Sequence, residues 1–134
     1  MNQVLLGVEK GWESLRVGDK FRTPDNAKGV DFTISKIESN RIVISPQKIS
    51  INRKAFEAAI DYLHENNHNA RNRCEIMSNN DRKKAGPLCQ ASRDKNNNTR
   101  CINYILPILK SKGLVDFSGD RPNKVWLINE NETS

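Results

Sequence analysis

The sequence is poor in cysteine and has no long apolar run. Its three cysteines, Cys74, Cys89 and Cys101, form no C-x-x-C pair, which favours reduced thiols in a cytosolic protein over a disulfide framework. Each lies beside apolar residues, so we expect buried side chains. No stretch approaches the length of a membrane-spanning helix. Residues 1–12 lack the positive region and apolar stretch of a signal peptide. We therefore expect a cytoplasmic protein, of a prokaryote or a virus.

The usual catalytic patterns are also missing. There is no phosphate-binding glycine loop and no G-x-S-x-G, and the carboxylates are scattered rather than paired. Pro24-Asp25 resembles the start of a nuclease motif, but no acidic-x-lysine pattern follows on a suitable strand. We expect no enzymatic activity and no cofactor.

One motif is typical of an enzyme. Residues 64–68, HENNH, match H-E-x-x-H, in which two histidines one helical turn apart hold zinc and the glutamate acts as general base. Here the motif crosses the predicted end of a helix, and with only two histidines in the chain a third ligand would have to be acidic, such as Glu75. The pattern favours a fraying helix end, and a zinc-dependent hydrolase remains as an alternative.

What the chain has in excess is positive charge, and it is concentrated. The net charge is +6. Residues 1–70 contribute +1, residues 71–100 carry eight Lys and Arg against three Asp and Glu, and residues 101–134 are balanced. Such a block is expected of a protein that binds a polyanion, the alternative being a solvated basic loop.

The chain has the length and apolar content for one core. Residues 18–24, 30–37 and 41–51 are rich in β-branched residues and separated by turn-forming segments, which predicts a small antiparallel sheet. Pro46 is expected to end the third strand or place it at an edge. We assign residues 1–51 to a small β-subdomain.

Helical spacing dominates the remainder. Asn52 is expected to cap a helix over 53–67, Pro87 to begin a second over 87–93, and Thr99 to cap a third that ends before Gly113. Pro107 should kink this third helix or leave it slightly irregular. The other expected elements are a short strand in 73–78, a hairpin of 114–117 and 124–128, and a disordered tail at 130–134.

The stretch NTRCINYILPILKSKGLVDFSGDRPNKVWLI carries a resemblance. Its helix, glycine and hairpin, preceded by helix, short strand and helix, resemble the winged helix-turn-helix family over residues 52–129. Ile102, Ile105, Leu106 and Leu109 fall at the core positions of that family, and residues 112–115 fall at its helix-to-wing junction. The resemblance implies an α+β chain in which the β-subdomain is followed by a winged helix.

It also implies a recognition helix over 99–112 that enters the major groove with its N-terminal residues nearest the bases. Arginine suits guanine and asparagine suits adenine, while lysines and arginines neutralise phosphates. The expected DNA-binding residues are Thr99, Arg100, Asn103 and Tyr104 on the helix, Arg82, Lys83, Lys84, Arg93 and Lys95 before it, and Arg121 and Lys124 on the wing.

The expected function is therefore non-catalytic binding of double-stranded DNA. The chain would serve as a transcription regulator or as the recognition module of a DNA-processing or restriction-like system, acting as a homodimer or within a larger complex. The alternative is a winged helix that binds another protein.

Overall fold

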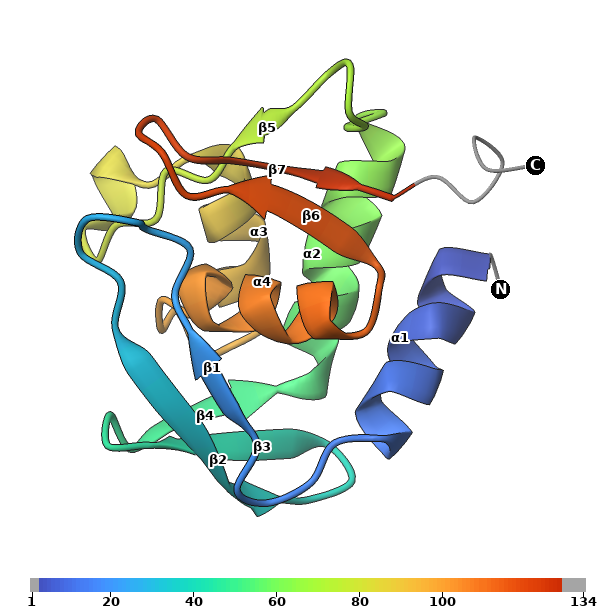
Figure 1. Cartoon of the computed structure of the whole chain (residues 1–134), viewed down its shortest axis with the longest axis vertical. Coiled ribbons are helices and arrows are strands. Elements are labelled where there is room, and N and C mark those ends of the chain that lie inside the picture. Colours follow the sequence, from blue (N-terminus) through green and yellow to red (C-terminus); the bar gives the residue numbers. More distant parts are fainter. Residues whose placement is uncertain (1–2, 129–134) are drawn as a thin grey trace.

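The chain folds as an α+β protein, as the sequence predicts; the computed structural model describes residues 3–128 (Figure 1). The predicted tail at 130–134 lies outside the described residues. In chain order the elements are α1 (Gln3–Glu13), β1 (Lys20–Arg22), β2 (Asp31–Ile37), β3 (Arg41–Ser45), β4 (Ile49–Asn52), α2 (Arg53–Glu65), β5 (Cys74–Glu75), the 3-10 helix η1 (Arg82–Lys84), α3 (Pro87–Asp94), α4 (Ile102–Ser111), β6 (Val115–Ser118) and β7 (Lys124–Leu127).

The first sheet is an antiparallel meander in the order β1-β2-β3-β4. Its inner face is formed by alternate residues, such as Phe32 and Ile34 on β2 and Ile42 and Ile44 on β3, all buried. Pro46 ends β3 as expected, and β4 begins after the turn, so the predicted third segment is two strands.

The sequence analysis did not predict α1. Two glycines lower its helix propensity, and both face side chains that lie close to the helix backbone. A Cβ at Gly7 would lie 2.6 Å from Leu114 Cδ2, and one at Gly11 would lie 2.9 Å from Lys112 Cγ. The glycines therefore let α1 approach the α4–β6 junction closely, while Trp12 packs edge-on against Phe56 of α2 at 5.3 Å between ring centroids.

The helices α2 and α3 form as predicted. Asn52 precedes α2, and its side chain accepts a hydrogen bond from the Lys54 N–H. One face of α2 is buried, through residues such as Phe56, Ile60 and Leu63. Pro87 occupies the first turn of α3, where its missing N–H costs no helical hydrogen bond.

The second sheet is three-stranded, in the order β5-β7-β6. β6 and β7 form the predicted hairpin, with Phe117 opposite Val125, and β5 pairs with the other edge of β7 through Cys74. Gly113, which follows the C-cap of α4, has a φ of 75°, a conformation that glycine adopts without strain. The predicted turn from the third helix into the hairpin is thus present.

The two parts of the chain share one hydrophobic core. α4 lies between the first sheet and the β6–β7 hairpin (Figure 1). Phe32 of β2 packs edge-on against Tyr104 of α4, with ring centroids 5.2 Å apart. The β-subdomain therefore covers α4 directly.

All three cysteines are buried and unpaired, as predicted. Burial raises the pKa of the Cys74 thiol to about 11 and that of Cys101 to about 12, so both are protonated and unreactive near neutral pH. Among residues 3–128, no helix has the length and apolar character needed to span a membrane.

Candidate nucleic-acid interface

The predicted recognition helix is the most enclosed helix of the described chain. Seven of the ten residues of α4 are buried. Tyr104 is 6% exposed and belongs to the core, so the expectation that it faces outward toward bases is wrong. The cause is the first sheet, which covers the side of α4 on which Tyr104 lies. In this conformation the face of α4 cannot enter a major groove, and only the two ends of the helix border the surface.

Thr99 does not cap α4. The helix begins at Ile102, and its N-cap residue, Cys101, makes no side-chain cap hydrogen bond. Thr99 is exposed, and its N–H donates to the Asn96 carbonyl at 2.9 Å. Thr99 belongs to the turn before α4 and not to the helix. In this turn Asn97 and Asn98 adopt φ values of 52° and 59°, a left-handed conformation that asparagine tolerates better than most residues.

The first asparagine of this turn, Asn96, makes hydrogen bonds to other parts of the chain. Its side chain is buried, accepts from the Asn52 N–H at 2.8 Å and donates to the carbonyls of Ser50 and Thr99. It therefore joins the turn before α4 to the end of β4 and the start of α2.

Two of the residues predicted to contact phosphates make structural contacts within the protein. Arg93 is 5% exposed, and its guanidinium donates to the carbonyls of Asn79, Asn80 and Asn98. It cannot reach a phosphate without unfolding these loops. Arg82 forms an ion pair with Asp94 at 2.7 Å and donates to Asn98 Oδ1 at 2.8 Å. Together the two arginines hold η1 and residues 79–80 against the α3–α4 turn.

Four other predicted residues stay available on the segments that these arginines join. We call Lys83, Lys84, Lys95 and Arg100 the basic rim. The three lysines are exposed and Arg100 is half-buried. None of the four forms an ion pair with a carboxylate of residues 3–128, whereas six cations elsewhere do. The rim is therefore a cluster of charge that is not neutralised within the described fold.

The turn of the hairpin is held by the β1–β2 loop. Arg121 forms an ion pair with Asp25 at 2.7 Å, and Asn26 Nδ2 donates to Asp120 Oδ1 at 2.9 Å. Asn123 donates to the Pro24 carbonyl. The Lys28 N–H and the Arg121 guanidinium hold the pKa of Asp25 below its ordinary value. The predicted wing cation Arg121 is thus engaged within the protein.

Lys124, the other predicted wing residue, differs from Arg121. It is half-buried on β7 and forms no ion pair with a described carboxylate. It lies opposite Ser118 of β6 and Glu75 of β5 in the strand register.

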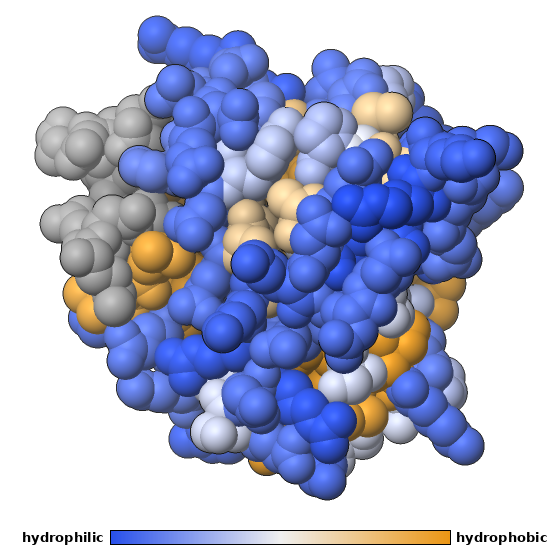
Figure 2. Space-filling model, turned by 180° about the vertical axis from the view of Figure 1, so that it is seen from behind, coloured by the Kyte–Doolittle hydropathy of each residue, from blue (hydrophilic) through white to orange (hydrophobic). Residues whose placement is uncertain are grey.

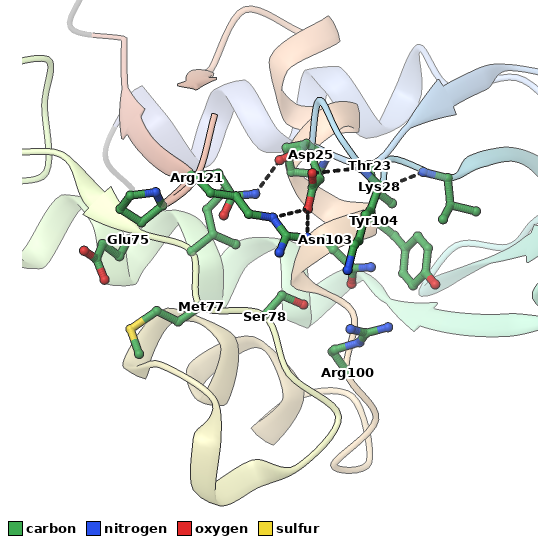
Figure 3. Close-up of a pocket in the computed structure, with 15 residues that line it drawn as sticks. Thr23, Asp25, Lys28, Glu75, Met77, Ser78, Arg100, Asn103, Tyr104 and Arg121 are labelled. Carbon is green, nitrogen blue, oxygen red and sulfur yellow. Dashed lines mark hydrogen bonds and ion pairs between the residues drawn. The ribbon is translucent and has the colours of Figure 1, made fainter. Parts of the chain in front are cut away.

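A cleft of about 460 Å³ opens at the N-terminal end of α4 (Figure 3). Its walls are the β1–β2 loop, residues 75–78, the hairpin turn at 121–123 and the first residues of α4. Arg100 and Asn103 line it, so the structure brings together two predicted base-reading residues. Lys28 and Ser78 also line it. Neither residue is expected at the site from the sequence, because no local signal places the β1–β2 loop or residue 78 beside α4.

The residues of the H-E-x-x-H motif do not lie on one helix. α2 ends at Glu65, so His68 does not share a helical face with His64. His68 instead stacks on Tyr62 and places Nδ1 2.9 Å from the Asn72 carbonyl oxygen. No group of three or more His, Cys, Asp or Glu side chains in residues 3–128 is arranged to hold a metal ion.

The molecular surface is mainly hydrophilic on the side shown in Figure 2, with separate apolar patches. The large apolar side chains exposed among the described residues are Leu6, Val17, Val30, Met77 and Ile128. Two of these, Val30 and Met77, line the cleft.

Comparison with known proteins gives no match: no family model, no curated protein and no solved structure is significantly similar to this chain.

Proposed function

We propose that the chain binds duplex DNA through the basic rim. The observation that carries the proposal is that its four cations lie on η1 and around the α3–α4 turn, which Arg82 joins, without a carboxylate partner among the described residues. Unneutralised cations on one surface attract a polyanion, and each one that contacts a phosphate releases a condensed counterion. Residues 71–100 hold most of the net charge of the chain, so the attraction is directed to one side.

The proposal includes the finer fold: residues 52–128 are a winged-helix variant. The order helix, short strand, helix, helix and hairpin supports it, as does the pairing of β5 with the hairpin strand β7. The variant differs in that the β-subdomain packs on α4.

The buried face of α4 changes how the DNA would be contacted. The basic rim would lie along the phosphates, and the N-terminal end of α4 would point at the duplex with Arg100 and Asn103. Arg121 would reach a phosphate only by exchanging its partner Asp25.

The test is a duplex-binding titration at several salt concentrations. We expect the affinity to fall steeply with salt, and the double variant Lys83→Ala with Lys84→Ala to flatten the logarithmic slope by about 1 unit per lost phosphate contact. The matched control is Lys10→Ala with Lys54→Ala. It removes the same charge from exposed residues of α1 and of the start of α2, neither of which lines the cleft.

The control pair should leave the slope close to that of the parent protein. Equal flattening by both pairs would mean that net charge, and not the basic rim, drives binding. If the parent protein binds no duplex at low salt, the proposal is wrong, and a protein partner becomes the better explanation of the exposed loops.

A further inference from the structure

The cleft at the end of α4 has the size of a small-ligand site. Its volume of about 460 Å³ lies in the range of roughly 300–1,000 Å³ that is typical of small-molecule pockets. A duplex is far too wide to enter a cleft of this size, but one nucleotide is not. The basic rim borders the cleft through Arg100, so a strand held on the rim passes its mouth.

The cleft also contains polar atoms that lack partners. Three buried side-chain atoms of the described residues make no hydrogen bond: Gln47 Oε1, Ser78 Oγ and Asn103 Oδ1. Two of them, on Ser78 and Asn103, belong to residues that line this one cleft. A buried polar group without a partner destabilises the fold, so their concentration here indicates a ligand that supplies the missing hydrogen bonds.

Apart from the Arg121–Asp25 ion pair, the charged residues that line the cleft lie on two different sides. Figure 3 shows Glu75 and Met77 on one side and Lys28 and Arg100 on the other. Neither Lys28 nor Arg100 is paired with a described carboxylate, and α4 begins beside them without a side-chain cap. A phosphate is therefore favoured on the Lys28–Arg100 side, where the partial positive charge of the helix end adds to the two cations.

The other uncharged and acidic residues of the lining suit a nucleobase. Met77 is half exposed and offers a polarizable thioether to an apolar ring face. Asn103 carries both a donor and an acceptor on one amide, the combination that pairs with the edge of a base, and the hydroxyl of Ser78 can both donate and accept. Glu75 can accept from an exocyclic amino group.

We infer that the cleft receives a single nucleotide that is unstacked from the bound DNA. Its phosphate would lie between Lys28 and Arg100 and its base edge against Asn103 and Ser78. The inference rests on the proposed DNA binding, because the basic rim supplies the contacts to the flanking phosphates. Extrusion costs less at a mismatched base than at a paired one, which gives the site a preference that can be measured.

The experiment uses the full chain and two duplexes that contain 2-aminopurine, whose fluorescence is quenched by stacking. In one the probe is correctly paired, and in the other it is mismatched. We expect the fluorescence to rise on binding, and the mismatched duplex to bind about 10-fold more tightly than the paired one. Asn103→Ala should abolish both effects. Asn40→Ala, the same substitution on the exposed turn between β2 and β3, should change neither.

Ser78→Ala is the second variant, and it should reduce the fluorescence gain without lowering the unfolding midpoint, because the hydroxyl has no partner to lose. If the parent protein binds duplex with the expected salt dependence but gives no fluorescence gain, the inference is wrong and the proposed function stands. If it binds no duplex, both fail. If free deoxyadenosine monophosphate binds in an Asn103-dependent way while the duplexes give no gain, the cleft is a site for free nucleotides and the inference is overturned.

Discussion

The helices α2 and α4 both carry apolar residues at helical spacing, yet one is a surface helix and the other is central. α2 buries one face and keeps the other in solvent, as an amphipathic helix of a small domain does. In α4 the stripe of Ile102, Ile105 and Leu109 is only part of the apolar surface, because Tyr104 and Ile108 fill the opposite side. A helix that is apolar all round is expected to be buried, and this signal was present in the sequence.

This difference shows that polar residues at the start of a helix do not indicate that the whole helix is exposed. Arg100 and Asn103 suggested a free recognition surface, but they mark only the end of α4 that reaches the cleft. The central position of α4 moves the candidate interface from a helix face to the loops around its N-terminus.

The largest effect that tests this comparison is expected at Ile108. If α4 had a single buried stripe, Ile108 would be exposed and truncation would cost little. Because it is 2% exposed, Ile108→Ala should lower the free energy of unfolding by about 2–5 kcal/mol, measured by urea denaturation. The contrasting variant is Lys54→Ala on the exposed side of α2, which should change it by less than about 0.5 kcal/mol. Similar small values for both would show that α4 is not enclosed in solution.

The next effect concerns the residue that joins the starts of the two helices. Asn96→Ala leaves the Asn52 N–H and the Ser50 carbonyl without their partner, so it should destabilise the fold by about 1–3 kcal/mol. Asn97→Gly in the same turn should be close to neutral, since glycine adopts a φ of 52° without strain. Urea midpoints of the two variants give the comparison. A loss at Asn97→Gly as large as that at Asn96→Ala would mean that the turn conformation matters more than the buried hydrogen bonds.

Much of the fold was predictable because its signals are local. The cap at Asn52, the proline that begins α3 and the glycine after α4 each act through the neighbouring backbone, and each is where the sequence places it. The start of α4 was misplaced at Thr99, because the asparagine turn takes up residues that resemble a cap.

The site was less predictable because it depends on contacts between distant residues. The bonds that hold the β1–β2 loop on the hairpin turn join residues 94 to 99 positions apart. Nothing local in the sequence places Lys28 in the same cleft as Arg100, and nothing shows that the guanidinium of Arg93 donates to three loop carbonyls. Sequence pattern indicated where the charge lies along the chain but not which cations remain free.

The smallest expected effect lies at the exposed contact that closes the cleft beside α4. The pKa of Asp25 is held below its ordinary value, so its carboxylate stabilises the fold at neutral pH, and this contribution disappears as the pH falls below about 4 through the lowered pKa. Asp25→Asn should therefore lower the urea midpoint slightly at pH 7, and by less at pH 3. The same comparison in an Arg121→Gln background should show a smaller difference at pH 7, because one of the groups that lower the pKa is gone. A difference that is equal at both pH values would mean that the charge of Asp25 does not hold the hairpin turn, and that Asn26 and Asn123 keep this wall of the cleft in place.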